Sequence, residues 1–170
     1  MKLLTLALAM TVFAAPAFAE SHMAAESTID MASLQGDAAA GEEQFNRQCV
    51  ACHVVQDTAT DEVLTGRNAK VGPNLYGVAG RTPGTHEGFA YGDAMIAYGE
   101  TGAVWDEANF VSYVQDPTGF LREALDDNRA RGKMAYQVRD EALAYDLFAF
   151  LATFGTEGDA AVDAEAAPSN

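Results

Sequence analysis

The stretch Cys49-Val50-Ala51-Cys52-His53 decides the fold, because it uses both cysteines of the chain and places a histidine directly after the second. Two thiols three residues apart lie on one side of a helical turn, where each can reach one vinyl group of a porphyrin. The adjacent imidazole then falls under the iron. This spacing is the attachment signature of a c-type haem. We therefore predict one covalently attached haem c, with His53 as an axial ligand of its iron.

Three simpler interpretations of the two cysteines compete with haem attachment: a dithiol redox pair, a structural disulfide and half of a zinc site. A redox pair or a disulfide leaves His53 without a role. Zinc needs two more ligands, which only the distant His22 and His86 could supply. The motif favours haem over all three.

The start of the chain predicts export. Lys2 precedes an apolar run over residues 3–15, which ends in Pro16-Ala17-Phe18-Ala19. This is the pattern of a secretory signal peptide over residues 1–19, cleaved after Ala19. The alternative is an uncleaved membrane anchor, but the run is short for a bilayer and is broken by proline. We expect a periplasmic protein, in a compartment that permits haem attachment.

The charge of the chain is strongly negative. It is −15 formally, and it becomes −16 after cleavage, because the signal contains one lysine and no acid. Such a chain should be soluble and should not bind nucleic acid. Residues 20–36 and 156–170 contain neither Lys nor Arg, which predicts a flexible leader and a disordered acidic tail. Residues 37–155 remain as one small domain.

Two amphipathic helices frame this domain. Apolar residues recur at helical spacing over 38–52, with Asp37 as N-cap, and again over 140–154. We expect these two helices to pack together, the first carrying the haem thiols on its last turn. Gly41 would allow a close crossing against an aromatic such as Phe150.

The middle of the domain predicts shorter helices and long loops. Asp106 is placed to cap a helix that ends at Pro117, and Asp116-Pro117 then begins another helix that reaches Leu125. Residues 57–102 contain many turn-forming residues and no strand alternation, with one short helix over 93–98. Loops this long are unusual in so small a domain. A buried porphyrin explains them, because it gives the loops a surface to wrap.

The second axial ligand is narrowed by elimination. Only Met95 and Met134 lie inside the domain, and Met95 sits in an apolar helical stretch that suits ordinary packing. Met134 lies in a polar loop with no core face to join, which favours it as the sixth ligand. A loop methionine that only covers a hydrophobic patch is the alternative. His86 is a rival ligand, although its surroundings indicate a surface turn.

The domain resembles a class I cytochrome c, and most of all the bacterial cytochrome c2 and c-550 group. The resemblance extends over residues 36–154, and its markers are Gly36-Asp-Ala-Ala-Ala-Gly-Glu42, the haem motif, Lys70-Val-Gly-Pro-Asn-Leu-Tyr-Gly77, Gly80-Arg-Thr82 and Gly132-Lys-Met-Ala-Tyr136. It implies a small all-α fold whose helices and long loops wrap one haem. It also implies roles for the matching residues. Pro73 would orient His53 through its carbonyl; Arg81, Tyr91 and Trp105 would bind a haem propionate; and Tyr113 would bond the sulfur of Met134.

Two departures from the family pattern affect what is carried over. Gly132 replaces a threonine that often contributes a propionate hydrogen bond, so that contact is not expected here. The family's ring of lysines is reduced to Lys70 and Lys133 in the mature chain. Basic residues instead flank the loop of Met134: Arg122, Arg129, Arg131, Lys133 and Arg139. We expect a basic face on an acidic body, which would orient docking.

The resemblance implies a monomeric one-electron carrier with no small-molecule substrate. His and Met ligation closes both axial positions and favours a high potential. Transient partners would be membrane redox complexes, namely a cytochrome bc1 donor and a terminal oxidase, photosynthetic reaction centre or reductase as acceptor. One alternative is an open haem site with peroxidase or gas-binding activity. Another is a structural haem domain that joins a larger assembly through its acidic tails.

Overall fold

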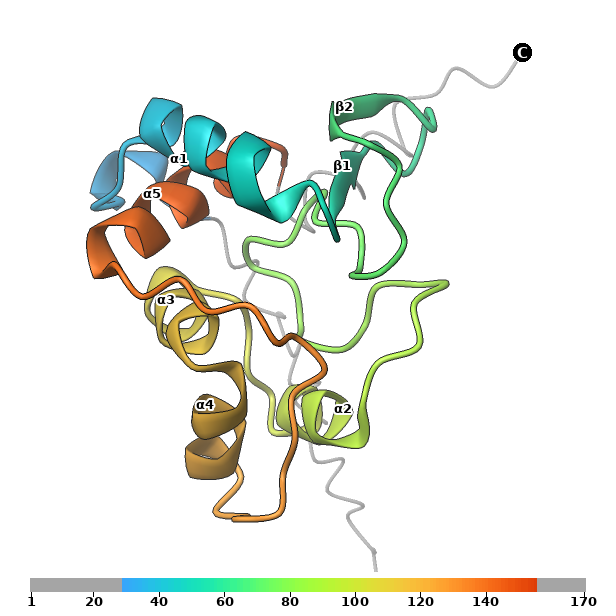
Figure 1. Cartoon of the computed structure of the whole chain (residues 1–170), viewed down its shortest axis with the longest axis vertical. Helices are drawn as coiled ribbons and strands as arrows, with labels where there is room; N and C mark the ends of the chain where they lie inside the picture. Colours follow the sequence, from blue (N-terminus) through green and yellow to red (C-terminus); the bar gives the residue numbers. More distant parts are fainter. Residues whose placement is uncertain (1–28, 156–170) are drawn as a thin grey trace, which may run out of the picture.

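The computed structural model describes residues 29–155. The predicted signal peptide, residues 20–28 of the leader and the tail at 156–170 lie outside the described residues. The domain is helical, as predicted, and it also contains one small β-hairpin (Figure 1). In chain order its elements are the 3-10 helix η1 (Met31–Ser33), α1 (Ala38–Gln44), the π-helical turn η2 (Phe45–Cys49), β1 (Val54–Gln56), β2 (Val63–Gly66), α2 (Asp93–Glu100), α3 (Glu107–Gln115), α4 (Pro117–Ala124) and α5 (Glu141–Ala152).

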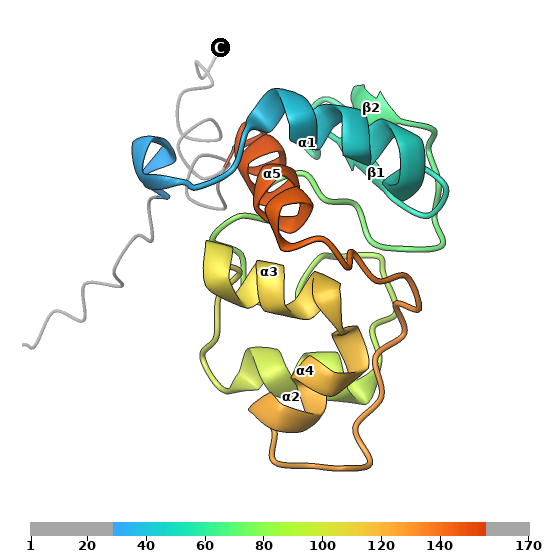
Figure 2. The ribbon, with the colours of Figure 1, turned by 60° about the vertical axis from the view of Figure 1, so that its left-hand side comes forward.

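The first and last helices cross closely, as the sequence predicts. Figures 1 and 2 show α1 lying across α5. Gly41 makes this possible, because a Cβ built there would overlap the carbonyl of Asp146 and lie 2.8 Å from Cβ of Phe150. The ring of Phe150 then packs 5.6 Å from that of the fully buried Phe45, measured between centroids. This crossing fixes the direction in which α1 delivers the chain to the two cysteines.

The predicted helix caps Asp37, Asp106 and Asp116 are confirmed, and Asp140, at the predicted start of the last helix, is a cap as well. Asp37 accepts hydrogen bonds from two backbone N–H groups at the start of α1, and Asp140 accepts one from Ala142 at the start of α5. Asp106 caps α3, and Asp116 caps α4, whose first residue is proline. Each carboxylate satisfies N–H groups that have no partner inside the helix. The helix starts are therefore set by local sequence.

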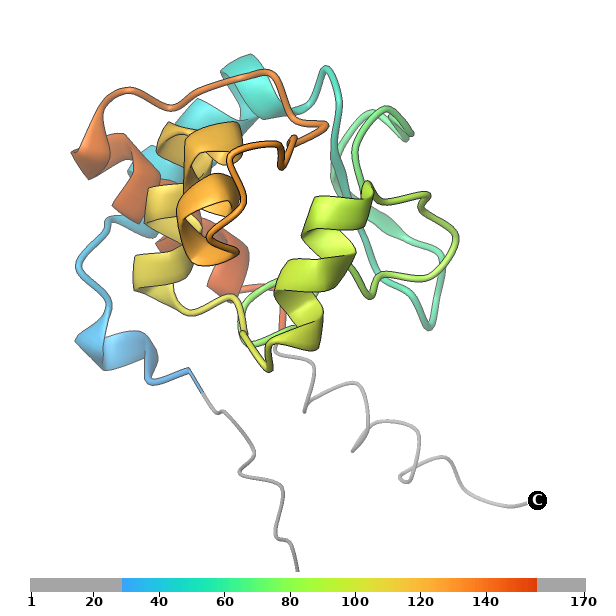
Figure 3. The ribbon, with the colours of Figure 1, turned by 90° about the horizontal axis from the view of Figure 1, so that it is seen from below.

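The remaining helices form the lower half of the molecule. Figure 2 shows α3 between α5 above and the pair α4 and α2 below. Seen from below in Figure 3, α2 stands on the opposite side of the last long loop from α3 and α4. Aromatic residues connect these elements, because Tyr98 of α2 lies 5.1 Å from Phe120 of α4 between ring centroids. None of the described helices is long and apolar enough to cross a membrane.

Two local features differ from the sequence prediction. The first helix stays α-helical only to Gln44 and then widens into the π-helical turn η2, where Val50 N–H bonds to Phe45 five residues back. Residues 57–102 were predicted without strands, but β2 pairs antiparallel with β1 at Val54↔Gly66. Strands of three and four residues are too short to show alternation in a sequence. The turn between them is instead set by Asp57, whose carboxylate accepts from Ala59 N–H and Thr60 N–H.

Residues 29–36, which the sequence assigns to the flexible leader, lie against the domain. The backbone N–H of Gln35 donates to Glu107 Oε1 over 2.9 Å, and its side-chain amide bonds the other oxygen of Glu107. Ile29 and Leu34 pack on the core. These contacts attach the start of the described chain to α3, on the far side of α1 from the cysteines.

Candidate haem site

The two thiols are delivered by the end of the first helix. Cys49 closes η2, and a tight turn follows in which the N–H groups of Cys52 and His53 both donate to the carbonyl of Cys49, over 3.0 and 2.9 Å. Both cysteines are free and half-buried. Burial, with the neighbouring Cys52 as a smaller cause, raises the pKa of the Cys49 thiol to about 11. The two thiols are therefore free, three residues apart and only partly buried, as attachment to two vinyl groups requires.

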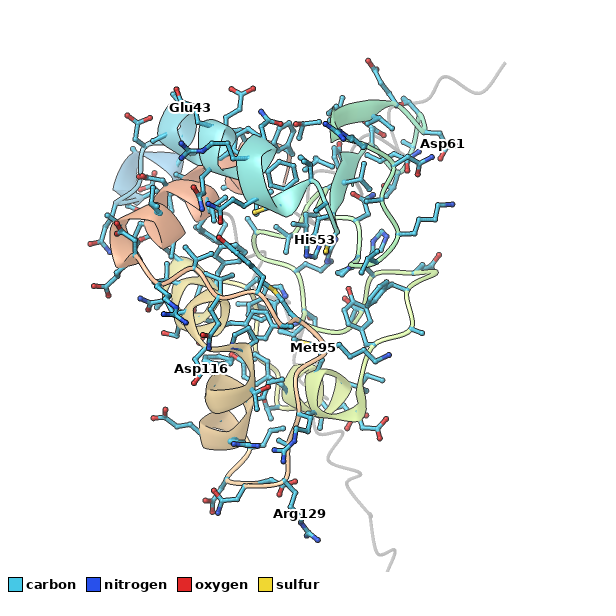
Figure 4. All side chains as sticks on the ribbon, in the orientation of Figure 1. Glu43, His53, Asp61, Met95, Asp116 and Arg129 are labelled. Carbon is cyan, nitrogen blue, oxygen red and sulfur yellow. The ribbon has the colours of Figure 1, made fainter. Side chains whose placement is uncertain are left out.

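The imidazole of His53 is held in one orientation. Its Nδ1 lies 2.9 Å from the carbonyl oxygen of Pro73. A carbonyl only accepts, so Nδ1 carries the proton and Nε2 keeps its lone pair for a metal. Burial lowers the pKa of His53, with the Pro73 carbonyl opposing it, so the ring is neutral at pH 7. Figure 4 shows His53 in the middle of the molecule, between the half with α1 and the half with α2.

The loop that carries Pro73 is docked on β1. Gly72 N–H donates to the carbonyl of Cys52 over 2.7 Å, and Leu75 N–H donates to that of Val54 over 2.9 Å. Asn74 adds a reciprocal pair with Gln56, whose N–H and carbonyl it bonds through its side chain. Sequence reasoning missed Asn74 and Gln56, although Asn74 stands next to Pro73. Their pairing fixes the position of the carbonyl that orients His53.

Two of the predicted propionate ligands are built into one buried unit. Arg81 is only 7% exposed, and its guanidinium donates to the carbonyls of Tyr76 and Asn74 over 2.8 and 3.2 Å. Trp105 is also buried, and its backbone pairs with the chain beside Arg81: Gly80 N–H donates to the Trp105 carbonyl, and Trp105 N–H donates to the Arg81 carbonyl. The Arg81 side chain is therefore enclosed and is not a solvated surface charge.

Tyr91 and Tyr113 approach the same region. The Arg81 charge acts on Tyr91, although burial is the larger influence and raises the pKa of Tyr91. Burial, with Tyr91 as a smaller cause, raises the pKa of Tyr113 to about 12. The ring of Tyr113 lies 5.0 Å from that of Trp105 between centroids. All four residues therefore gather at one place, with both phenols protonated and able to donate.

The candidates for the sixth ligand occupy different places. Met95 lies in α2, is 8% exposed and belongs to the core, which agrees with a packing role. Met134 is half-buried and lies in the loop before α5, against the edge of the core. His86 is half-buried as well, and burial with the Arg81 charge lowers its pKa. It lines an open polar cavity of about 340 Å³ together with Gly72 and Pro73.

The residues present fit a covalently bound haem. Gly72 leaves room where any Cβ would overlap the His53 ring, coming within 2.6 Å of Nδ1. The free thiols, the fixed imidazole and the enclosed cation are the donor set that a c-type haem needs. Among the described residues, no group of three or more His, Cys, Asp or Glu side chains could hold a metal ion.

Comparison with known proteins decides the family. The chain is 58% identical to a cytochrome c2 of Rhodovulum adriaticum over 122 residues, which are 72% of this chain and 95% of that protein. It belongs to the cytochrome c2 family. The crystal structure of cytochrome c2 from Rhodobacter sphaeroides matches with a TM-score of 0.69 at 47% identity, over 72% of this chain and 99% of that one. Ferric cytochrome c-550 from Paracoccus versutus matches with a TM-score of 0.63 at 42% identity, over 71% and 98%.

No family model matches the chain. The relatives nevertheless confirm the sequence prediction on fold, cofactor and class. The protein is an electron-transfer protein of the small cytochrome c fold and carries one haem c. Cys49 and Cys52 have the spacing of the attachment motif.

Proposed function

We propose that this chain is a soluble periplasmic one-electron carrier whose haem iron is ligated by His53 and Met134. When bound, the haem supplies a one-electron couple that needs no open coordination site. The observation that carries the proposal is the contact between His53 Nδ1 and the Pro73 carbonyl, which fixes the ring and reserves Nε2 for iron. The predicted signal peptide supports export.

The position of His86 supports Met134 as the second ligand. His86 lines its cavity with Gly72 and Pro73, and Pro73 is the residue that Nδ1 of His53 faces. A second ligand would be needed on the Nε2 side of His53, so His86, which shares its cavity with the Pro73 loop on the Nδ1 side, is the less suitable candidate. Met134 lies in the loop before α5, which is bonded to α4 through Gly132 and to α3 through Val138.

The buried guanidinium of Arg81 and the phenols near it support a propionate-binding role for Arg81, Tyr91 and Trp105. A carboxylate taken out of water needs a fixed cation and several donors. Arg81 supplies the cation, and its bonds to the Tyr76 and Asn74 carbonyls hold it in place. Two phenols that stay protonated at neutral pH add donors.

The docking face is expected around the Met134 loop, but its basic residues are not equivalent. Lys133 donates to a backbone carbonyl over 2.6 Å, and Arg122 donates to the Ala130 carbonyl through Nε. Arg129 forms an exposed ion pair with Asp127, with 3.8 Å between N and O. Arg131 is exposed and bonds only weakly to Ala130, over 3.3 Å. Together with the exposed Arg139, it is therefore one of the two cations of this group that are most available to a partner's carboxylates.

The carrier role can be tested with membranes that contain a quinol-oxidising complex and a terminal oxidase but lack endogenous c-type carriers. Adding the reduced holoprotein should restore quinol-dependent oxygen uptake, with each protein molecule cycling many times. Loss of oxygen uptake in Cys52→Ser, which cannot hold the haem normally, is the control. No uptake with the intact holoprotein would contradict the proposal.

A further inference from the structure

The loop that carries Met134 is attached mainly from one side. We call residues 130–138 the ligand loop. Its hydrogen bonds to the helical side are Arg122 Nε to the Ala130 carbonyl (3.1 Å), Gly132 N–H to Thr118 Oγ1 (3.2 Å), Gln137 Nε2 to Asp116 Oδ1 (3.3 Å) and Val138 N–H to the Val114 carbonyl (2.8 Å). All four reach α3, α4 or the residue between them. They leave the opposite side of the loop to other contacts.

Lys133 makes that opposite contact. Its Nζ donates to the carbonyl of Ala90 over 2.6 Å, across 43 positions of sequence. Its stem lies along Gly92, where a Cβ would sit 3.5 to 3.8 Å from three of the Lys133 side-chain carbons. Both the charged end and the apolar stem of Lys133 therefore rest on the segment that precedes α2. Within residues 29–155, this is the hydrogen bond that joins the ligand loop to that segment.

The segment that receives Lys133 also carries Tyr91. Tyr91 follows Ala90 directly, packs 4.8 Å from Phe89 between ring centroids and lies close enough to Tyr113 of α3 to contribute to the raised pKa of that phenol. The Lys133 contact thus connects the ligand loop to Ala90 and Tyr91, and so to the region of Tyr113 in α3. Releasing it would free one side of the loop immediately before Met134.

We propose that Lys133 is a positioning residue that clasps the ligand loop from its second side and so keeps Met134 on the iron. This inference rests on the ligation by Met134 proposed above. Lys133 acts through the backbone at Ala90 and not by touching the iron. A partly exposed hydrogen bond to a charged group is modest, so its loss should change the exchange of Met134 by about 3- to 10-fold.

The test uses the ferric holoprotein and imidazole, a neutral probe that competes with Met134 for iron. In Lys133→Leu, imidazole should bind about 3- to 10-fold more tightly than in the unaltered protein. Lys70→Leu is the matched control, since it removes the same charge from an exposed side chain and should leave imidazole affinity unchanged. Lys133→Arg keeps a donor and should restore most of the original affinity.

Two further readouts separate the possible outcomes. The free energy of unfolding in urea should be the same for Lys133→Leu and Lys70→Leu. A loss of global stability in Lys133→Leu equal to its gain in imidazole affinity would overturn the positioning role. Equal imidazole affinities in the two leucine variants would overturn it as well. The sulfur-to-iron charge-transfer band should be present at rest in both variants. Absence of this band from the unaltered holoprotein would instead overturn the ligation by Met134, and with it the basis of the clasp.

Discussion

At the scale of single residues, the site depends on how tightly His53 is enclosed. The Pro73 carbonyl holds one edge of the ring, and Gly72 covers it without a side chain. Gly72→Ala places a Cβ against the ring atoms, and the ring cannot move without breaking the bond to Pro73. We expect a yield of low-spin holoprotein reduced to a small fraction of normal, as measured by the haem absorption per polypeptide.

A matched substitution distinguishes this contact from a general effect of alanine. Gly92→Ala adds the same methyl group at a position where the nearest atoms lie at an ordinary 3.5 Å. Holoprotein yield should be unchanged there. Equal yields in Gly72→Ala and Gly92→Ala would show that the His53 ring is not confined as described.

Tyr98 gives a residue-scale prediction for alkaline pH. Burial raises the pKa of Tyr98, and the Asp106 carboxylate adds to the shift. A folded-state pKa above the unfolded value of about 10 means that the fold retains the proton. The stabilisation is complete below about pH 10 and is lost as pH rises towards the folded-state pKa.

Tyr98→Phe removes the ionisable group, so its unfolding free energy should fall less steeply above pH 10 than that of the unaltered protein. Urea titrations between pH 8 and pH 11 measure this slope. Tyr136→Phe, the same substitution at a residue that is 43% exposed, is the control. A Tyr98→Phe slope as steep as the original would contradict the assignment.

At the scale of elements, the crossing of α1 and α5 holds the cysteine-bearing turn in place. Gly41→Ala should improve helix propensity by about 1 kcal/mol. Overpacking costs about 1–3 kcal/mol, and here the nearest atoms are the backbone of Asp146, which cannot rotate away. The overlap with the backbone places the cost near the upper end of that range, so we expect a net loss of about 2 kcal/mol in urea unfolding. Glu42→Ala, at the next residue and on the exposed face of α1, is the control and should change the free energy of unfolding by less than about 0.5 kcal/mol. A similarly small effect of Gly41→Ala would mean that α1 and α5 can move apart freely.

Elements that depend on local sequence were predictable, and those that depend on distant pairing were not. Asp37, Asp106 and Asp140 mark their helix starts because each cap acts within three residues. The attachment of Gln35 to Glu107 and the bond from Lys133 to Ala90 join residues far apart in sequence. The hairpin was missed for another reason, because strands of three and four residues are too short to show alternation. The motif at Cys49–His53 predicts the cofactor because the spacing of its two thiols and its histidine is what haem attachment requires. The hydrogen bonds that place Trp105 beside Arg81 are between backbone groups, so no side-chain pattern in the sequence indicates them.

At the scale of the whole molecule, an acidic protein should steer its partners through the few cations that remain available. Arg131→Glu should slow electron transfer to an acidic redox complex by about threefold or more at low ionic strength, with the difference shrinking in salt. Stopped-flow rates at two salt concentrations provide the measurement. Arg47→Glu makes the same charge change on η2 and should slow electron transfer less. Equal slowing by both variants would mean that Arg131 acts only through the net charge of the protein and not through its position.

The central claim is a closed iron site held by His53 and Met134, and one set of absorption spectra tests it most directly. The ferric and ferrous holoprotein should be low-spin, show a sulfur-to-iron charge-transfer band in the ferric form and ignore added carbon monoxide in the ferrous form. Met134→Ala should lose the band and bind carbon monoxide. A high-spin spectrum, or ready carbon monoxide binding by the unaltered protein, would show an open iron and contradict the account.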